Sequence, residues 1–281
     1  MASFIDAAAI VGNGTALVLY QDALGLTAGM IGVLSAALTF SIAIGALCGG
    51  ALGDRYGRHR VFSVTMVVIV LGSALLTFST AYPALLVGVV LLGLGTGADL
   101  PVSLASIAEA ASDDNRGALI GLSNVLWVVG ITAVTAMTSF AGDMGRLSGQ
   151  LIYGMVGVIS LLVLVARMSI PGSESWLKSR DEHRRQPDTV QTARMSVQAL
   201  LRGPYSRAFL VLLLFYALTN LAANTAGQFN SYVAVNVADL SVQTYSRIGL
   251  IGILLAGQSN AQDLWIGPRL DAKGVPSRVI D

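Results

Sequence analysis

Long apolar stretches alternate with short polar breaks along most of this chain. A helix needs about 20 apolar residues to cross the ~30 Å hydrocarbon core of a membrane. Because lipid offers no partner for exposed backbone groups, such stretches are expected to be helical. The pattern therefore predicts eight membrane-crossing helices, at about residues 4–21, 28–52, 61–80, 84–108, 117–140, 148–167, 208–234 and 247–266.

The composition agrees with a membrane protein. Of the 281 residues, 54% are hydrophobic and only 12% are charged, whereas soluble proteins carry about 25% charged residues. The formal net charge of +1 gives no electrostatic reason to expect nucleic acid as a partner. We expect the lipid bilayer as the partner, a multi-pass protein of the cell (inner) membrane, and no cofactor or metal.

One short stretch concentrates charge between two long uncharged runs. Gly50–Arg60 holds Asp54, Arg55, Arg58 and Arg60, while residues 23–53 and 61–98 contain no charged side chain outside it. We expect this stretch to be a tight hairpin loop at the membrane surface. Its pattern, Gly-x-x-x-Asp-Arg-x-Gly-Arg-x-Arg, resembles the loop between the second and third helices of the major facilitator superfamily of secondary transporters.

The resemblance implies an all-α membrane protein built from two six-helix halves. Residues 1–167 would form the six-helix first half, 168–207 a cytoplasmic linker, and 208–281 the first two helices of the second half. Gly267–Gly274 repeats the glycine and aspartate spacing of the charged loop, which agrees with a second repeat. We expect four further helices of the full fold to be missing. The resemblance also places Asp6 half-way along the family's first helix, so we expect N-terminal turns of that helix to be missing here.

Basic residues predict the orientation in the membrane. If the Asp54 loop faces the cytoplasm, fifteen of the seventeen lysines and arginines fall on the cytoplasmic side. Only Arg146 and Arg247 fall on the other side. The opposite orientation would invert this bias.

The fourth apolar stretch is rich in glycine. Gly93–Pro101, continuing to Glu109, resembles the fourth helix of the sugar and organic-metabolite porters. The glycines also suggest a dinucleotide-binding turn, but that turn needs a preceding strand, so close helix packing is the better interpretation. Pro171–Leu177 resembles a sugar-porter signature with Glu174 two places late, and Val89 stands where those porters often have arginine. These departures leave sugar, polyol and organic acid open as solutes.

The resemblance also implies a charged latch at the cytoplasmic face that holds one orientation of the transporter. The alternative is a plain positive anchor without a switching role. The residues concerned are Gly50, Asp54, Arg55, Gly57, Arg58, Glu109, Arg116 and Glu174.

Acids at membrane depth are rare, and they are usually neutralised or functional. Asp99 lies within the fourth stretch, with Ser103 and Ser106 on the same helical face. We expect Asp99 to carry a coupling proton, and Asp6 is a second candidate. The alternatives for Asp99 are a local cap beside Pro101 or an interface acid.

Polar side chains repeat every four residues along the seventh stretch and share one helical face. Amides in lipid need a polar partner or water, so we interpret the face as the solute-binding surface. Hydrogen bonding between helices is the alternative. The predicted solute-binding residues are Tyr216, Asn220, Asn224, Gln228 and the neighbouring Asn230, with Asn124 and Trp127 from the fifth stretch.

No constellation in the sequence is typical of an enzyme. The sequence therefore predicts secondary active transport of a small polar organic solute, coupled to protons, with the two halves rocking around the solute. The rival hypothesis is a truncated membrane protein on the same fold that does not transport and acts as a partner subunit or sensor.

Overall fold

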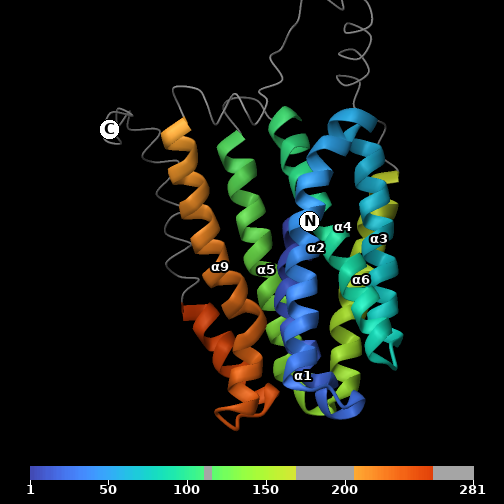
Figure 1. Cartoon of the computed structure of the whole chain (residues 1–281), viewed down its shortest axis with the longest axis vertical. Helices are drawn as coiled ribbons and strands as arrows, with labels where there is room; N and C mark the ends of the chain where they lie inside the picture. The colour runs from blue at the N-terminus through green and yellow to red at the C-terminus, as the bar shows by residue number, and fades with distance from the viewer. Residues whose placement is uncertain (111–115, 169–205, 256–281) are drawn as a thin grey trace, which may run out of the picture.

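The computed structural model describes residues 1–110, 116–168 and 206–255, and its long elements are helices that run along the longest axis (Figure 1). Seven of the described helices are long and apolar enough to cross a membrane. They are α1 (Ala2–Leu24), α2 (Ala28–Tyr56), α3 (Arg58–Phe78), α4 (Tyr82–Ala110), α5 (Arg116–Ala141), α6 (Arg146–Met168) and α9 (Ser206–Asn236), with the 3-10 turn η1 (Gly142–Met144) after α5 and a shorter apolar helix, Val242–Leu255, after α9.

The first seven predicted spans are confirmed, and most extend a few residues beyond the apolar core at one or both ends. The helix at the eighth span already begins at Val242. The rest of that span lies outside the described residues, as do the linker between 168 and 206 and the repeat at 267–274. Asp6 lies in the first turns of α1, and its place in a longer first helix stays a prediction.

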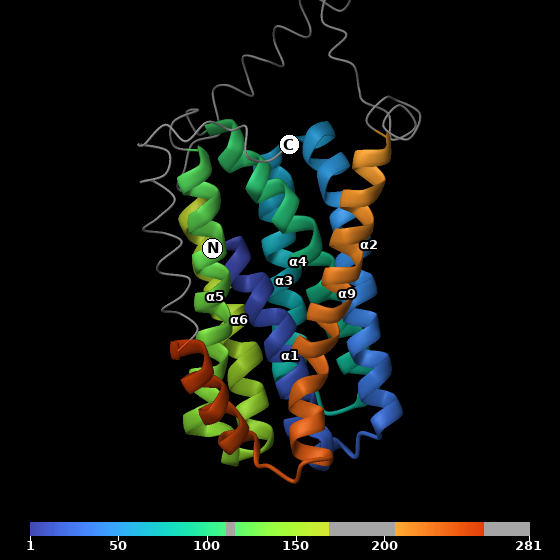
Figure 2. The ribbon, with the colours of Figure 1, turned by 90° about the vertical axis from the view of Figure 1, so that its left-hand side faces the viewer.

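We call the two ends of the bundle the inner and the outer end. Helix α9 begins at the inner end, where α2 ends at Tyr56 and α3 begins at Arg58, whereas α1 begins part-way along the bundle (Figure 1, Figure 2). The basic residues predict that this end faces the cytoplasm. Helices α1 and α9 end at the outer end.

The predicted hairpin loop at Gly50–Arg60 is wrong in its extent. Helix α2 continues through the charged residues to Tyr56, and α3 begins at Arg58. Gly57 alone makes the turn, with φ 92° and ψ 135°, a conformation that side chains disfavour. The charged residues therefore occupy the two helix ends on either side of Gly57, and they do not break either helix.

The prediction of close packing through glycines is confirmed for α4. Tyr82–Ala110 is a single helix, so no strand precedes the glycines and the dinucleotide alternative falls. A Cβ added at Gly97 would overlap the backbone of Ile42 on α2, and one added at Gly49 would lie 2.5 Å from the Ala98 carbonyl oxygen. A Cβ at Gly95 would lie 2.6 Å from the Ile69 side chain on α3. Helix α4 is thus held tightly between α2 and α3.

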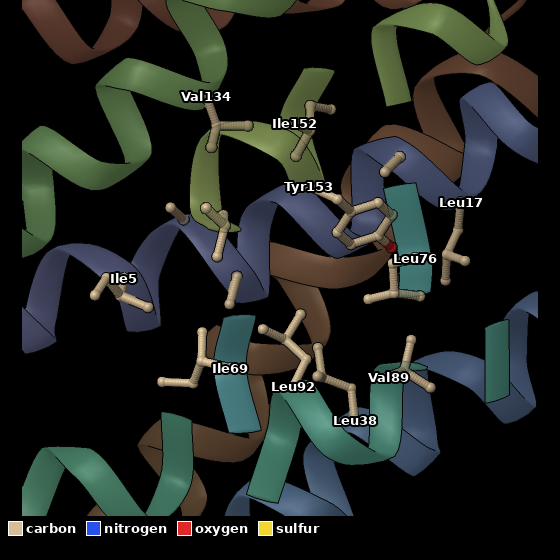
Figure 3. Close-up of a cluster of buried hydrophobic side chains, with 14 of the residues drawn as sticks. Ile5, Leu17, Leu38, Ile69, Leu76, Val89, Leu92, Val134, Ile152 and Tyr153 are labelled. Carbon is tan, nitrogen blue, oxygen red and sulfur yellow. The ribbon is translucent and has the colours of Figure 1, made fainter. Parts of the chain in front are cut away.

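Helix α1 lies at the centre of the described bundle. Nearly all of its residues from Ser3 to Tyr20 are buried, and it contacts α4, α5, α6 and α9. Figure 3 shows part of the core, where Ile5 and Leu17 lie close to side chains from α2 to α6. The outward faces are also apolar: Phe40 is 72% exposed and Phe140 is 81% exposed. An apolar exterior around a packed interior suits a protein surrounded by lipid.

The two basic residues at the outer end both bond to the ends of helices. Arg146 donates to the carbonyl oxygen of Ser79, 2.8 Å away, at the end of α3. Arg247 donates to the carbonyl oxygen of Ser139, 3.2 Å away, in the last turn of α5. The last carbonyls of a helix lack partners within it and carry partial negative charge. This capping role explains why these two arginines depart from the charge bias.

Candidate solute site between the two halves

Helices α1 and α9, from different halves, are joined by pairs of polar side chains. Each pair is separated by 215 or 216 residues in sequence, so the two helices run past each other in register. We call this set of contacts the first outer seam. Its pairs are Asn13 with Gln228 (3.3 Å), Thr15 with Ser231 (2.9 Å), and Gln21 with Asn236 in a reciprocal amide pair (3.0 and 3.2 Å).

A second outer seam joins α5 to the helix Val242–Leu255. It lies in the last turns of α5 and therefore also at the outer end. Two of its contacts bond side chains of the second half to carbonyl oxygens of the first. The contacts are Thr138 to Ser246 (2.7 Å), Arg247 to the carbonyl of Ser139 (3.2 Å) and Gln243 to the carbonyl of Phe140 (3.3 Å).

The inner part of α9 lacks such cover. Leu212, Phe215 and Leu221 are each 66–68% exposed. Figure 2 shows α9 converging on α1 toward the outer end and leaning away from it toward the inner end. Within the described residues, the halves are therefore closed together at the outer end and apart at the inner end.

The innermost contact of the first seam belongs to a buried polar network. Asn13, the midpoint of α1, is fully buried, and Gln228 is 3% exposed. The Tyr153 hydroxyl on α6 donates to the Asn13 side-chain oxygen at 2.9 Å. Gln228 donates in turn to the Thr39 hydroxyl on α2 at 2.6 Å. Four helices therefore meet in one hydrogen-bonded chain in the outer half of the bundle.

Asp6 and Trp127, predicted separately, lie together. Asp6 on α1 is 7% exposed, and the Trp127 side chain on α5 lies near enough to interact with its carboxyl group. Gly130 permits this approach, since a Cβ there would lie 2.5 Å from the Phe4 carbonyl oxygen. Trp127 itself is 38% exposed, and Asn124, one turn earlier, is also exposed. This part of α5 thus joins a buried acid to an open surface.

Asp99 lies inside the first half. It is 2% exposed and accepts hydrogen bonds from Thr65 on α3 and Ser103 on α4, both at 3.4 Å. Arg167 on α6 is near enough to interact electrostatically with the carboxylate. Ser106, the other predicted neighbour, donates instead to the backbone of its own helix. Asp99 is thus a buried acid at the interface of α3, α4 and α6.

The polar face of α9 divides into two parts. Tyr216 is 67% exposed, and the amides of Asn220 and Asn224 each donate to the carbonyl oxygen four residues earlier. Only Gln228, one turn further out, is buried in contact with α1 and α2. Asn230 is exposed and lies on nearly the opposite face of the helix from Gln228.

The predicted latch residues in the described chain gather at the inner end by backbone position. Gly50, Asp54 and Arg55 lie in the last turns of α2, and Gly57 and Arg58 follow directly. The Arg55 guanidinium stacks 5.4 Å above the ring of Tyr56. Glu109 lies at the end of α4 and Arg116 at the start of α5, and Glu174 lies outside the described residues. The ion pairs of the latch stay a prediction.

Sequence reasoning missed three members of the central network, Asn13, Thr39 and Tyr153. The signal for Asn13 was present, because Asn13-Gly14-Thr15 interrupts an apolar span and Asn13 lies two turns after Asp6. Thr39 and Tyr153 carry no such signal. Single hydroxyls are common in membrane helices and bond readily to their own backbone.

A family model described as the Major Facilitator Superfamily matches residues 1–267. The chain belongs to this superfamily. It is accordingly a multi-pass membrane protein, and the family and the relatives below are transporters rather than enzymes.

Two relatives within the superfamily come from bacteria. The minor myo-inositol transporter IolF of Bacillus subtilis is 34% identical over 244 residues, which cover 86% of this chain and 56% of the relative. The putative metabolite transport protein YaaU of Escherichia coli is 30% identical over 174 residues, which cover 62% of this chain and 39% of the relative. The chain thus spans about half the length of these relatives.

Solved structures of superfamily members share the fold. A crystal structure of a D-xylose-proton symporter superposes with a TM-score of 0.65 at 16% identity, covering 97% of this chain and 68% of the other. The nucleoside transporter NupG superposes with a TM-score of 0.65 at 14% identity, covering 98% and 67%. At these identities the likeness concerns the fold alone.

Proposed function

We propose that this superfamily member carries a small polar organic solute across the membrane by alternating access, coupled to protons. The observation that carries the proposal is the one-sided closure of the two halves. Both seams lie at the outer end, while the inner part of α9 stands away from the first half. Such an arrangement is expected of a carrier that is open toward the cytoplasm.

A polyol is the solute class that we propose. The relative IolF is named as a myo-inositol transporter, and it matches 86% of this chain. Asn220, Asn224 and Gln228 lie on α9 at and just inside the innermost contact of the first outer seam. Their amide groups can both donate hydrogen bonds to hydroxyl groups of a polyol and accept hydrogen bonds from them. Trp127 and Asn124 provide a second exposed surface, on α5.

We assign proton coupling to Asp99, with Asp6 as the second candidate. Asp99 is buried and is held by neutral hydroxyl donors, so gain or loss of a proton would change its contacts with α3 and α6. Asp6 lies nearer to the proposed solute surface through Trp127. The charges near Gly57 would then bias the equilibrium between inward- and outward-facing forms.

Uptake by the purified 281-residue chain in proteoliposomes tests the proposal. Labelled myo-inositol is offered under an inward proton gradient, with a protonophore and liposomes without protein as controls. Gradient-dependent accumulation is the expected result. Binding of myo-inositol without any flux would favour the non-transporting alternative, and the absence of both binding and flux would contradict the polyol assignment.

A further inference from the structure

The hydrogen-bonded chain in the outer half of the bundle has a defined direction. It links Tyr153, Asn13, Gln228 and Thr39, and the first three are at most 3% exposed. An amide can in principle be turned by 180°, exchanging its oxygen and nitrogen, so its orientation follows from its partners. The partner that decides the orientation here is Thr39.

The Thr39 hydroxyl has a single hydrogen, and it donates this hydrogen to the carbonyl oxygen of Ser35, 3.1 Å away on the same helix. While it makes this bond, its oxygen can only accept from Gln228. The Gln228 nitrogen must then face Thr39, and the Gln228 oxygen must face Asn13. Asn13 donates to that oxygen, which leaves its own oxygen to accept from Tyr153.

The reversed chain is less favourable at its other end. In the reversed chain the Tyr153 hydroxyl would accept a hydrogen bond from the Asn13 nitrogen, whereas in the structure it donates to the Asn13 oxygen. The hydroxyl hydrogen would then need another acceptor around a side chain that is 1% exposed. Both ends of the chain thus select the same orientation of Gln228.

We propose that Thr39 is a specificity-determining positioning residue, which acts by fixing the orientation of the Gln228 amide, with Tyr153 and Asn13 fixing it from the other side. The proposal rests on the proposed function, in which Gln228 binds the solute. The Gln228 amide nitrogen donates one of its two hydrogens to Thr39, and the amide oxygen accepts from Asn13 with one of its two lone pairs. One hydrogen and one lone pair therefore stay available, each in a fixed direction. Neighbouring hydroxyls of a polyol can accept from the first and donate to the second.

The orientation is tested without solute, on the 281-residue chain in lipid nanodiscs with ¹⁵N-labelled glutamine side chains. The Gln228 amide signal is identified by its loss in Gln228→Leu. Thr39→Val should shift or double this signal, whereas Thr39→Ser, which keeps the hydroxyl, should leave it in place. Thr132→Val is the matched control, because that hydroxyl donates to the carbonyl of its own helix at Val128. An unchanged Gln228 signal in Thr39→Val would overturn the proposal.

The role in recognition is tested by myo-inositol binding and uptake. Thr39→Val should raise KM about tenfold with kcat within about twofold, the result expected when uniform binding is lost. Thr39→Ser should behave as the original chain, and Tyr153→Phe should raise KM less, because Asn13 still donates to Gln228. An equal loss of kcat in Thr39→Val and Thr132→Val would contradict a positioning role. If the original chain does not bind myo-inositol but Thr39→Val still shifts the Gln228 amide signal, the polyol proposal is refuted and the orientation of Gln228 stays supported.

Discussion

Replacing Arg247 with methionine should weaken the outer closure. Arg247 lies in the second half and bonds to the carbonyl oxygen of Ser139 at the end of α5, in the first half. Methionine has similar length but neither a charge nor a donor. Of the three contacts that define the second outer seam, the substitution removes the one made by a charged group, while Thr138 and Ser246 keep theirs.

The size of the effect follows from the exposure of this contact. A hydrogen bond to a charged group contributes about 1.5–3 kcal/mol when buried, and a cation at an exposed helix end contributes about 0.3–1 kcal/mol. Since Arg247 is exposed, we take about 1–1.5 kcal/mol. This corresponds to a shift of roughly five- to twelvefold toward the form that is open at the outer end.

Thiol labelling from outside measures this shift. The reporter is Ser231→Cys, which lies 3% exposed in the first outer seam, in a Cys48→Ser background that removes the native exposed cysteine. A membrane-impermeant reagent added to right-side-out vesicles should label the reporter roughly five- to twelvefold faster in Arg247→Met. Arg146→Met is the matched control, because Arg146 caps a helix within one half. Equal labelling in Arg247→Met and the original chain would refute the reasoning.

The other predictions concern stability, packing and coupling. Arg146→Met should lower the free energy of unfolding by about 1–3 kcal/mol, measured by denaturant unfolding in detergent, because a helix end loses its half-buried cap; an unchanged midpoint would contradict this. Gly97→Leu should abolish monodisperse protein in size-exclusion chromatography, whereas Gly121→Ala, with nothing within 4 Å of its added Cβ, should be tolerated. Asp99→Asn should keep solute exchange, but its uptake should no longer respond to a proton gradient. The control Asp22→Asn, at an exposed position, should keep this response. A response retained in Asp99→Asn would exclude Asp99 as the coupling site.

The membrane spans were predictable because lipid imposes one simple requirement on every crossing segment. Apolar length sufficed for the first seven helices. The loop at Gly50–Arg60 was predicted wrongly, because charge indicates contact with water and does not indicate a break in the helix. Only the positive φ of Gly57 marks the turn, and the three glycines in this stretch look alike in the sequence.

The candidate site was predictable where a side chain is costly in lipid. Asp6, Asp99 and Gln228 stand out for this reason, and the structure places each of them in a buried polar setting. Partnerships were not predictable, because they depend on how helices far apart in sequence pack. The bond from Tyr153 to Asn13 spans 140 residues, and nothing local to either residue indicates it.

The distance between the outer ends of α1 and α9 tests the central claim most directly. Spin labels at Asp22→Cys and Val237→Cys, both exposed positions beside the first outer seam, would report it by pulsed electron paramagnetic resonance. We expect two distance populations, a short one matching the closed seam and a longer one that grows with myo-inositol and proton concentration. A single short distance that neither solute, nor pH, nor Arg247→Met alters would contradict a carrier that opens at this end.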